Sequence, residues 1–229
     1  MGIRESLASV PLFKGLTDQQ YDELAMVVVD QEFVRGRTIF SEGDDGVGFY
    51  VIISGQIKIY KLSPEGKEQI LHVFGAGEPF AEAAVFAGSS YPAHAMALKN
   101  SRVFFIPREA FRDLIKDNPS LAMNMMASLS MRLKRFAHMI EDLSLKEVPG
   151  RLAAHLLYLD SEQGGAGNEV ELQIGKAHLA SLLGTIPETL SRILTRMSKK
   201  GLIDSSGKTV RLLDRQGLEE LATGEQRLG

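Results

Sequence analysis

The 229-residue chain contains no cysteine. Disulfide bonds, thiolate zinc sites and cysteine-ligated iron–sulfur clusters are therefore excluded. No apolar run approaches the roughly 18 residues that a membrane-spanning helix needs. The first residues lack the basic start and apolar middle of a signal peptide. From these absences we expect a protein of the reducing cytoplasm that has no membrane partner.

The sequence also lacks the common catalytic motifs. It has no P-loop, no dinucleotide-binding glycine pattern after a strand, no nucleophile elbow and no H-E-x-x-H pair. Glu78 and Glu82 could be taken for paired carboxylates, but no general acid–base partner accompanies them. Asp44 and Asp45 in a glycine-rich turn lack EF-hand spacing. We therefore expect that the protein is not an enzyme.

The most informative segment, Gly184-Thr-Ile-Pro-Glu-Thr-Leu-Ser-Arg-Ile-Leu194, predicts the turn and second helix of a helix-turn-helix. Pro187 suits the first helical turn, where a missing N–H costs nothing. Glu188, Ser191 and Arg192 fall at i, i+3 and i+4, so they share one face near the start of the helix. Such side chains can meet base edges in a DNA major groove. The alternative is a solvated face on an ordinary amphipathic helix.

The flanking segments predict a winged helix-turn-helix. A strand is expected over 170–174, a helix over 176–183, and a β-hairpin wing from Leu202-Ile203 through a turn at 205–208 to 210–213. Between Val170 and Leu213 there are seven Lys and Arg residues against three Asp and Glu, although the whole chain carries a net charge of −3. A local positive surface on an acidic protein suits attraction to phosphates.

The first half of the chain is typical of β structure bordered by helices. Thr17 is expected to cap a helix from about 18 to 28, and short strands are expected at 33–34, 38–40, 49–53 and 56–60. Glycine-rich and proline-containing turns separate them. Many short strands between such turns indicate a β-roll or barrel, which can carry a ligand cavity. The predicted fold class is α+β.

A long helix that begins at Pro119 carries apolar residues spaced 4 and 3 apart, which is a heptad seam. The seam comprises Ala122, Met126, Leu129, Leu133, Phe136, Ile140 and Leu143. A symmetric copy of the same helix is the simplest partner, so we expect a homodimer with Met126, Leu129, Leu133, Phe136 and Ile140 at its interface. Alternatively, the seam packs only on its own β-roll.

The predicted organisation has three parts. A sensor β-roll domain spans 1–118, a dimerisation helix spans 119–145, and a winged helix-turn-helix domain spans 146–229. Within the third part, Val148-Pro149-Gly150 interrupts the seam, and a new helix is expected from Arg151 to Leu159.

This order of parts resembles the CRP/FNR family of bacterial transcription regulators over nearly the whole chain. Three motifs carry the resemblance: Glu42-Gly43-Asp44 with Tyr50-Val-Ile-Ile-Ser-Gly55, Gly77-Glu-Pro-Phe-Ala-Glu82, and Pro187-Glu-Thr-Leu-Ser-Arg192. The resemblance implies an allosterically controlled, dimeric regulator that binds palindromic DNA and contacts RNA polymerase.

The E-x-x-S-R form looks like the FNR-type subset, which implies half-sites containing TTG. Glu188 would accept from cytosine N4 and Arg192 would donate to guanine, as donor–acceptor matching also predicts. The cyclic-AMP receptors usually have an arginine where Pro187 stands here, which argues against a guanine contact outside TTG. The full set of expected DNA-binding residues is Lys176, Pro187, Glu188, Thr189, Ser191, Arg192 and Lys199.

The expected effector site departs from the cyclic-AMP-binding pattern, in which G-E-L is followed ten and eleven residues after the glutamate by arginine and serine. The corresponding residues here are Phe80, Ala81, Glu82, Pro92 and Ala93. Ala81 replaces the glycine, and Pro92 and Ala93 replace the arginine and serine. Because a phosphate needs such a cation and hydroxyl, cyclic AMP is not the expected effector. Sensing through an FNR-type iron–sulfur cluster is also excluded, because the chain has no cysteine to bind the cluster.

The chain most resembles the HcpR and DNR branches, which are associated with nitric oxide and nitrosative stress and for which haem is the proposed sensing group. His94 would then be the candidate axial ligand, although a histidine hydrogen-bonded in the roll is the more ordinary interpretation. The effector and cofactor stay open. Three alternatives also stay open: a cyclic-nucleotide-type module acting through protein contacts, a cyclic-AMP-responsive regulator, and a regulator that needs no effector.

Overall fold

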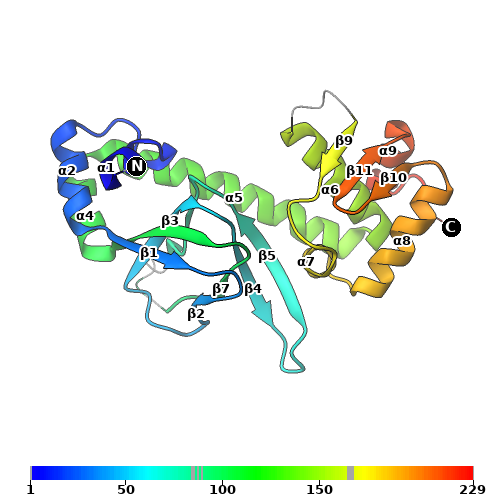
Figure 1. Ribbon diagram of the computed structural model, residues 1–229, viewed down its shortest axis with the longest axis horizontal. Helices are drawn as coiled ribbons and strands as arrows, with labels where there is room; N and C mark the ends of the chain where they lie inside the picture. The colour runs from blue at the N-terminus through cyan, green and yellow to red at the C-terminus, as the bar shows by residue number, and fades with distance from the viewer. Residues whose placement is uncertain (1, 84–85, 87, 89, 164–167, 229) are drawn as a thin grey trace. The chain divides into compact units, whose positions relative to one another are not determined.

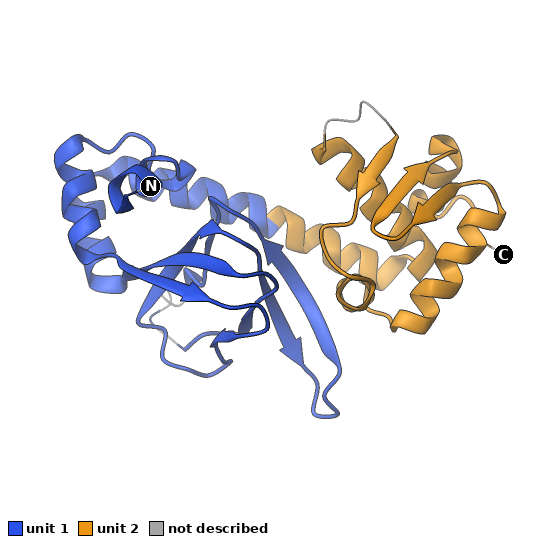
Figure 2. Cartoon of the chain, viewed as in Figure 1, with its two compact units in different colours: residues 1–133 blue, residues 134–229 orange. Residues whose placement is uncertain are grey.

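The computed structural model describes every residue except 1, 84–85, 87, 89, 164–167 and 229. The chain divides into two compact units, Met1–Leu133 and Lys134–Gly229 (Figure 2). The dividing point falls inside one long helix, α5 (Pro119–Leu145). Among the described residues, no helix is both long enough and apolar enough to cross a membrane.

The strands of unit 1 form two antiparallel sheets (Figure 1). One sheet has the order β1-β8-β3-β6 and the other the order β2-β7-β4-β5. Their bounds are β1 Val29–Phe33, β2 Thr38–Phe40, β3 Gly48–Ser54, β4 Ile57–Leu62, β5 Glu68–Phe74, β6 Pro79–Phe80, β7 His94–Ala97 and β8 Ser101–Pro107. The β3–β4 turn contains Gly55, whose φ of +97° is a left-handed conformation that glycine adopts without strain.

Along the chain, helices precede and follow the strands of unit 1. They are α1 (Ile3–Ala8), a 3₁₀ turn (Pro11–Phe13), α2 (Asp18–Val27), α4 (Arg108–Asp117) and the first part of α5. As predicted, Thr17 caps α2: its hydroxyl accepts from the Gln20 N–H, and the Gln20 side chain accepts from the Thr17 N–H at 2.9 Å. This reciprocal pair satisfies two N–H groups that would otherwise lack partners.

Alternation along β3 divides unit 1 into two cores. Phe49 and Val51 face the helices, where they pack with residues of α1, α2, α4 and α5. Tyr50 and Ile52 face the interior of the roll and pack with Phe80 and other side chains of the two sheets. The two-residue period of a strand places successive side chains on opposite faces, so one strand serves both cores.

Helix α5 buries a different stripe from its predicted seam. Leu121 and Met125, which are four residues apart, are fully buried against the helix-side core of unit 1. Of the seam, Met126, Leu133 and Ile140 are exposed, while Leu129 and Phe136 are half-buried. The alternative in which the seam packs on its own roll is therefore not what this chain shows.

Unit 2 is a winged helix-turn-helix. Its helices are α6 (Val148–Glu162), α7 (Lys176–Leu182), α8 (Pro187–Lys199) and α9 (Arg215–Thr223). Its strands β9 (Glu169–Glu171), β10 (Ile203–Ser206) and β11 (Thr209–Leu212) form one sheet in the order β10-β11-β9. Helix α6 approaches α9 closely at Gly150, where an added Cβ would lie 2.7 Å from the Leu221 carbonyl oxygen.

The predicted α+β fold, with its β-roll, long helix and winged helix-turn-helix, is confirmed, but several predicted boundaries are wrong. Helix α6 begins at Val148 rather than Arg151, because Pro149 is accommodated in a first turn. The strand expected over 170–174 is β9, which ends at Glu171. The turn of the wing is shorter than predicted, because β10 continues to Ser206 and β11 begins at Thr209. Gly207 lies in this turn with a φ of +62°.

Candidate nucleic-acid interface and effector site

A tight turn positions α8, the second helix of the helix-turn-helix. Gly184 has a φ of +67°, and the Thr185 N–H donates to the Ala180 carbonyl at 2.9 Å. Ile186 is extended, and Pro187 opens the helix. Proline fixes its φ angle near the helical value and has no N–H that would need a partner in the first turn. Pro187 therefore determines the residue at which α8 begins.

Apolar and polar side chains lie on different faces of helix α8. Leu190, Ile193, Leu194 and Met197 are buried in the core of unit 2. Glu188, Ser191 and Arg192 are exposed, and an Arg192 Nη2 lies 3.3 Å from the hydroxyl of half-buried Thr189. The structure thus brings five of the predicted residues (Pro187, Glu188, Thr189, Ser191 and Arg192) together on the first two turns of one helix. Lys199 is exposed in the last turn of α8, and Lys176 is exposed at the start of α7.

A groove of about 510 Å³ runs beside these residues within unit 2. Its lining includes Thr189, Arg192 and Arg196 from α8 and Arg151 from α6. An Nη of Arg151 donates to the Lys146 carbonyl at 2.8 Å, and burial lowers the pKa of its guanidinium. Arg196 was counted among the cations of the positive segment but was not named as a DNA-binding residue, and Arg151 was not predicted for this surface. Arg196 lies one turn after Arg192, a spacing that could have indicated it, whereas Arg151 approaches only through tertiary packing.

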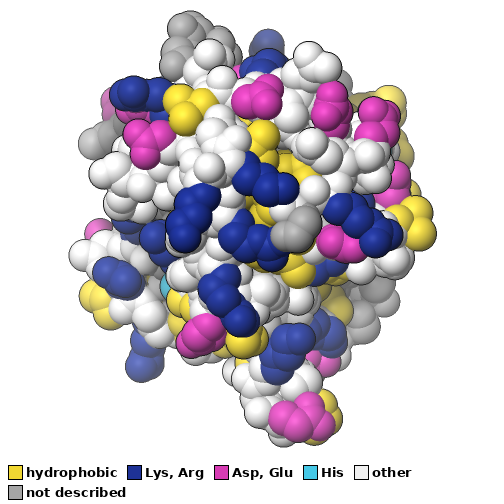
Figure 3. Space-filling view, turned by 90° about the vertical axis from the view of Figure 1, so that its right-hand side faces the viewer, with side chains coloured by type: hydrophobic (Ala, Val, Ile, Leu, Met, Phe, Trp, Pro, Cys, Tyr) yellow, Lys and Arg dark blue, Asp and Glu magenta, His cyan; other side chains and the backbone are white. Residues whose placement is uncertain are grey.

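The wing adds a further exposed cation. Lys208 follows Gly207 in the β10–β11 turn, and its carbonyl accepts from the Leu172 N–H at 2.7 Å. Figure 3 faces the side drawn at the right of Figure 1 and shows Lys and Arg side chains gathered over the middle of that face, with apolar side chains among them. A surface of this kind can attract the phosphate backbone of a nucleic acid.

In unit 1, the residues predicted for an effector site lie in different surroundings. Glu82 is 1% exposed, and its carboxylate forms an ion pair with Arg132 of α5. The same guanidinium donates to the Pro79 carbonyl at 2.9 Å and lies over the Phe74 ring, 4.6 Å from its centroid. Among the described residues, the second Glu82 oxygen is buried without a hydrogen-bond partner. One carboxylate oxygen of Glu82 therefore accepts no hydrogen bond from the described residues.

Arg132 was missed from the sequence. It lies between Met131 and Leu133 on a helix whose spacing drew attention only to the seam, and 50 positions separate it from Glu82. Only the packing of α5 on the roll brings the two together. The pair connects the β6 region of the roll to α5 within unit 1.

The other predicted effector residues have apolar side chains and differ in their burial. Phe80 is fully buried, Ala93 is buried and Pro92 is exposed. Ala81 has a φ of +67°, a region that costs a residue with a Cβ roughly 1–2 kcal/mol. Glycine would adopt this conformation without that cost.

Aromatic rings fill the described interior of the roll. Phe40 stacks on Tyr91 with centroids 3.9 Å apart, and Tyr50 stacks on Phe80 at 5.0 Å. The Tyr91 hydroxyl donates to the Gly48 carbonyl at 3.0 Å. Burial raises the pKa of the Tyr50 phenol, so this hydroxyl stays neutral. The interior is therefore mostly apolar, with few polar groups.

His94, the candidate axial ligand, lies at the start of β7 and already has partners for its ring. Its Nδ1 accepts from the Glu42 N–H at 3.1 Å, and its Nε2 lies 3.9 Å from the Glu42 carboxylate. The ring stacks on Tyr60 with centroids 5.1 Å apart. These contacts favour the ordinary structural interpretation over iron ligation, since a ligand nitrogen must be free to face the metal.

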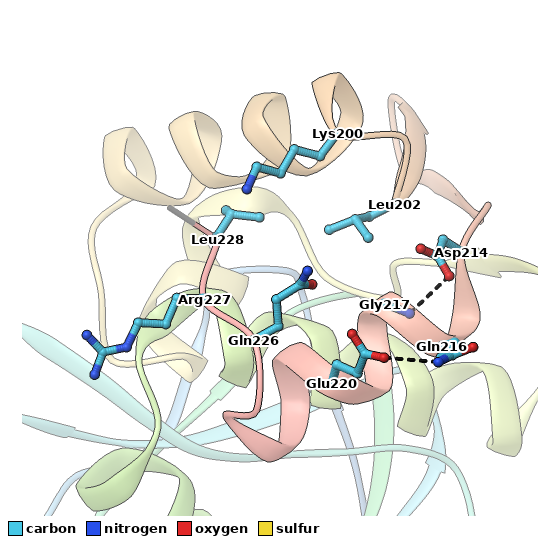
Figure 4. A pocket seen from close by; sticks show the side chains of 9 residues that line it. All are labelled: Lys200, Leu202, Asp214, Gln216, Gly217, Glu220, Gln226, Arg227 and Leu228. Atoms are coloured by element: carbon cyan, nitrogen blue, oxygen red, sulfur yellow. Dashed lines mark hydrogen bonds between the residues drawn. The ribbon is translucent and has the colours of Figure 1, made fainter.

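A smaller pocket of about 280 Å³ lies in unit 2 where the C-terminal segment packs near the end of α8 and α9 (Figure 4). Leu228 of this segment is buried. Polar side chains here bond within the pocket: Asp214 accepts from the Gly217 N–H, and Gln216 donates to Glu220 (Figure 4). None of the predicted site residues lines this pocket.

Comparison with known proteins agrees with both units. Residues 30–118 match the cyclic nucleotide-binding domain family, and residues 150–221 match the Crp-like helix-turn-helix domain family. The chain is 31% identical to the CRP-like cAMP-activated global transcriptional regulator of Mycobacterium tuberculosis, over 95% of this chain and 99% of that one. It is 32% identical to the fumarate and nitrate reduction regulatory protein of Escherichia coli, over 90% and 84%.

Among solved structures, a CooA mutant from Carboxydothermus hydrogenoformans has the same fold, with a TM-score of 0.79, 22% identity, and coverage of 97% of this chain and 96% of that one. A cyclic-nucleotide-binding-type roll joined to a winged helix-turn-helix defines a DNA-binding transcription regulator with an effector domain. The chain belongs to the CRP/FNR family of transcription regulators.

Proposed function

We propose that the protein is a homodimeric, sequence-specific regulator that binds TTG-containing palindromes through α8. The observation that carries this proposal is the exposed set Glu188, Ser191 and Arg192 over the fully apolar buried face of the same helix. A helix held rigidly by its buried face can present such side chains to base edges without rearrangement. Its place of action would be the cytoplasm, with RNA polymerase as a further partner.

Donor and acceptor chemistry assigns the contacts. Arg192 would donate two hydrogen bonds to the O6 and N7 of guanine, and Glu188 would accept from cytosine N4. Ser191, next to both, would contact the adjoining bases. Lys176, Thr189 and Lys199 would bind phosphates, which position the protein without reading sequence. Arg151 and Arg196, which line the adjacent groove, would add to the attraction for the backbone.

Dimerisation is supported by the exposed seam of α5. Met126, Leu133 and Ile140 are large apolar side chains that one chain leaves in water. Together with half-buried Leu129 and Phe136, they form a stripe that a second copy of α5 would cover. A two-fold dimer presents two recognition helices, which matches the symmetry of a palindromic operator.

The proposed effector is a small molecule other than cyclic AMP, and it acts by favouring one of two arrangements of the dimer. Pro92 and Ala93 supply neither a cation nor a hydroxyl for a cyclic phosphate, and Arg132 is already paired with Glu82. The buried Glu82 oxygen that has no hydrogen-bond partner among the described residues would accept from a hydroxyl or amine of the ligand. A haem-bound gas such as nitric oxide, as in the HcpR and DNR branches, is a weaker effector candidate, because His94, its proposed axial ligand, already accepts from the Glu42 N–H.

A cyclic-AMP-responsive regulator is a second candidate function, favoured by the 31% identity with a regulator named for activation by cAMP. Isothermal titration of the full chain with cyclic AMP separates the two. Our proposal predicts a Kd weaker than about 1 mM, whereas micromolar binding would establish the cyclic-AMP candidate. A Soret band after haem addition that is lost in His94→Ala would establish haem sensing.

Fluorescence anisotropy with a labelled TTG palindrome and a scrambled duplex tests DNA recognition. We expect the palindrome to bind roughly 10³-fold or more tightly than the scrambled duplex, with an affinity that falls as salt rises. Arg192→Ala should lose about 1–3 kcal/mol per half-site. Arg112→Ala removes an exposed cation from unit 1 and is the matched control, which should bind as the wild type does. Equal affinity for both duplexes would contradict the proposal.

A further inference from the structure

An apolar side chain stands exposed at the tip of the proposed recognition helix. Ile186 is the residue immediately before α8 and is 51% exposed, although the other large apolar residues of this segment, Leu190, Ile193, Leu194 and Met197, are buried. Its carbonyl accepts from the Leu190 N–H at 3.0 Å, which fixes Ile186 relative to the helix. The exposed side chain therefore has a defined position at the end of α8.

The position is unusual for isoleucine. Serine, threonine, aspartate and asparagine are preferred there, because their side chains accept from the first N–H groups of the helix. Ile186 makes no such bond. Pro187, also exposed, extends the apolar surface by one residue. Two apolar residues thus occupy the helix end just before Glu188, where a polar cap would stabilise the fold more.

The major groove presents one apolar group on its floor, the 5-methyl of thymine. We propose that Ile186, with Pro187 beside it, packs against a thymine methyl of each TTG half-site and is a specificity-determining residue. The inference rests on the proposed DNA-binding function and adds a contact that the polar residues cannot make. Glu188 and Arg192 select the G·C pair by hydrogen bonding, and Ile186 selects thymine by exclusion of its methyl from water.

Replacing thymine by deoxyuridine removes only that methyl and leaves base pairing unchanged. Anisotropy titrations of the full-length protein would compare the TTG palindrome with one in which both thymines of each TTG are deoxyuridine. The wild type should lose roughly fourfold in affinity per contacted methyl, hence about fifteenfold for one methyl in each half-site. Ile186→Ser should bind the two duplexes within about twofold of each other. Because serine is a preferred residue at this position, the variant is expected to fold.

Leu213→Ser is the matched control, since Leu213 is 53% exposed in the same unit and lies after β11 rather than at the tip of α8. This variant should keep the wild-type sensitivity to deoxyuridine. The inference is overturned if the wild type binds both palindromes equally, or if Ile186→Ser retains the full difference. A wild type that does not distinguish the palindrome from a scrambled duplex overturns the proposed function as well, so the two failures are distinguishable.

Discussion

The two units hold the polar groups of their candidate sites in opposite ways. In unit 2, Glu188, Ser191 and Arg192 are exposed on a helix whose stability comes from a separate apolar face. In unit 1, Glu82 is buried and paired with Arg132, so the candidate effector residue also belongs to the packing. A recognition surface of the first kind can change specificity without affecting folding. A site of the second kind cannot change its ligand without a change in stability.

The strongest test of this contrast concerns α5, which carries an exposed seam as well as Arg132, the half-buried partner of Glu82. Leu133→Asp would place two like charges in the proposed dimer interface, and we expect monomers by analytical ultracentrifugation and a near-complete loss of palindrome binding. Met131→Asp is the matched control: Met131 is 69% exposed and Leu133 is 70% exposed, but Met131 lies off the seam. Dimers in Leu133→Asp would show that the interface is misassigned.

The second prediction concerns the buried pair. Glu82→Gln leaves the half-buried Arg132 guanidinium without its counter-charge. Removal of one partner from a fully buried pair costs about 3–5 kcal/mol, and the partial exposure of Arg132 lowers the expected cost. Urea unfolding followed by circular dichroism should therefore show a lower midpoint. Glu109→Gln, which alters an exposed pair with Arg112, should leave the midpoint unchanged. Wild-type stability in Glu82→Gln would mean that the site is not coupled to folding.

A third, smaller effect depends on pH and belongs to unit 2. Burial lowers the pKa of His155 on α6 to about 4, below the value of about 6.5 in an unfolded chain. Between pH 6.5 and pH 4, the imidazole is therefore protonated in the unfolded state but neutral in the folded state. The free energy of unfolding is highest above pH 6.5 and falls as the pH drops toward 4. The loss at pH 5 should reach up to about 2 kcal/mol.

His155→Gln should remove this part of the pH dependence in urea unfolding at pH 7.5 and pH 5. His138→Gln, at an exposed position on α5, is the matched control and should keep the wild-type difference between the two pH values. An unchanged pH dependence in His155→Gln would show that the imidazole of His155 does not limit the stability of unit 2 in acid.

The smallest predicted effect concerns the cap of α2. Thr17→Ala removes the hydroxyl that accepts from the Gln20 N–H and should lower the free energy of unfolding by about 1 kcal/mol. Thr17→Ser keeps the hydroxyl and should retain most of this stability. Thermal unfolding of the three proteins measures the difference, and equal midpoints for alanine and threonine would exclude a contribution from the cap.

The same contrast explains what could be predicted from the sequence. Helix α8 was predicted with its first residue, because Pro187 and the spacing of Leu190, Ile193, Leu194 and Met197 are local signals. The contact between Glu82 and Arg132 could not be predicted, since 50 positions separate them and only tertiary packing brings them together.

The boundaries of α6 and the burial of α5 side chains also depend on tertiary packing, so the sequence predicts them only in part. The interruption was predicted at Val148-Pro149-Gly150, but α5 ends at Leu145 and these three residues form the first turn of α6. The seam of α5 was visible as a heptad pattern. The pattern did not show that Leu121 and Met125 lie in the helix-side core of unit 1, against which only Leu129 of the described seam residues packs.

The most direct test of the central claim is a double-mutant cycle between Arg192 and the guanine of TTG. Affinities of wild type and Arg192→Ala would be measured for the palindrome and for one carrying 7-deazaguanine, which lacks the N7 acceptor, at both guanines. We predict that the wild type loses about 1–3 kcal/mol per half-site on the base change and that Arg192→Ala loses nothing further. A wild type indifferent to the 7-deaza substitution would contradict the assignment of α8 as the reader of the TTG half-site.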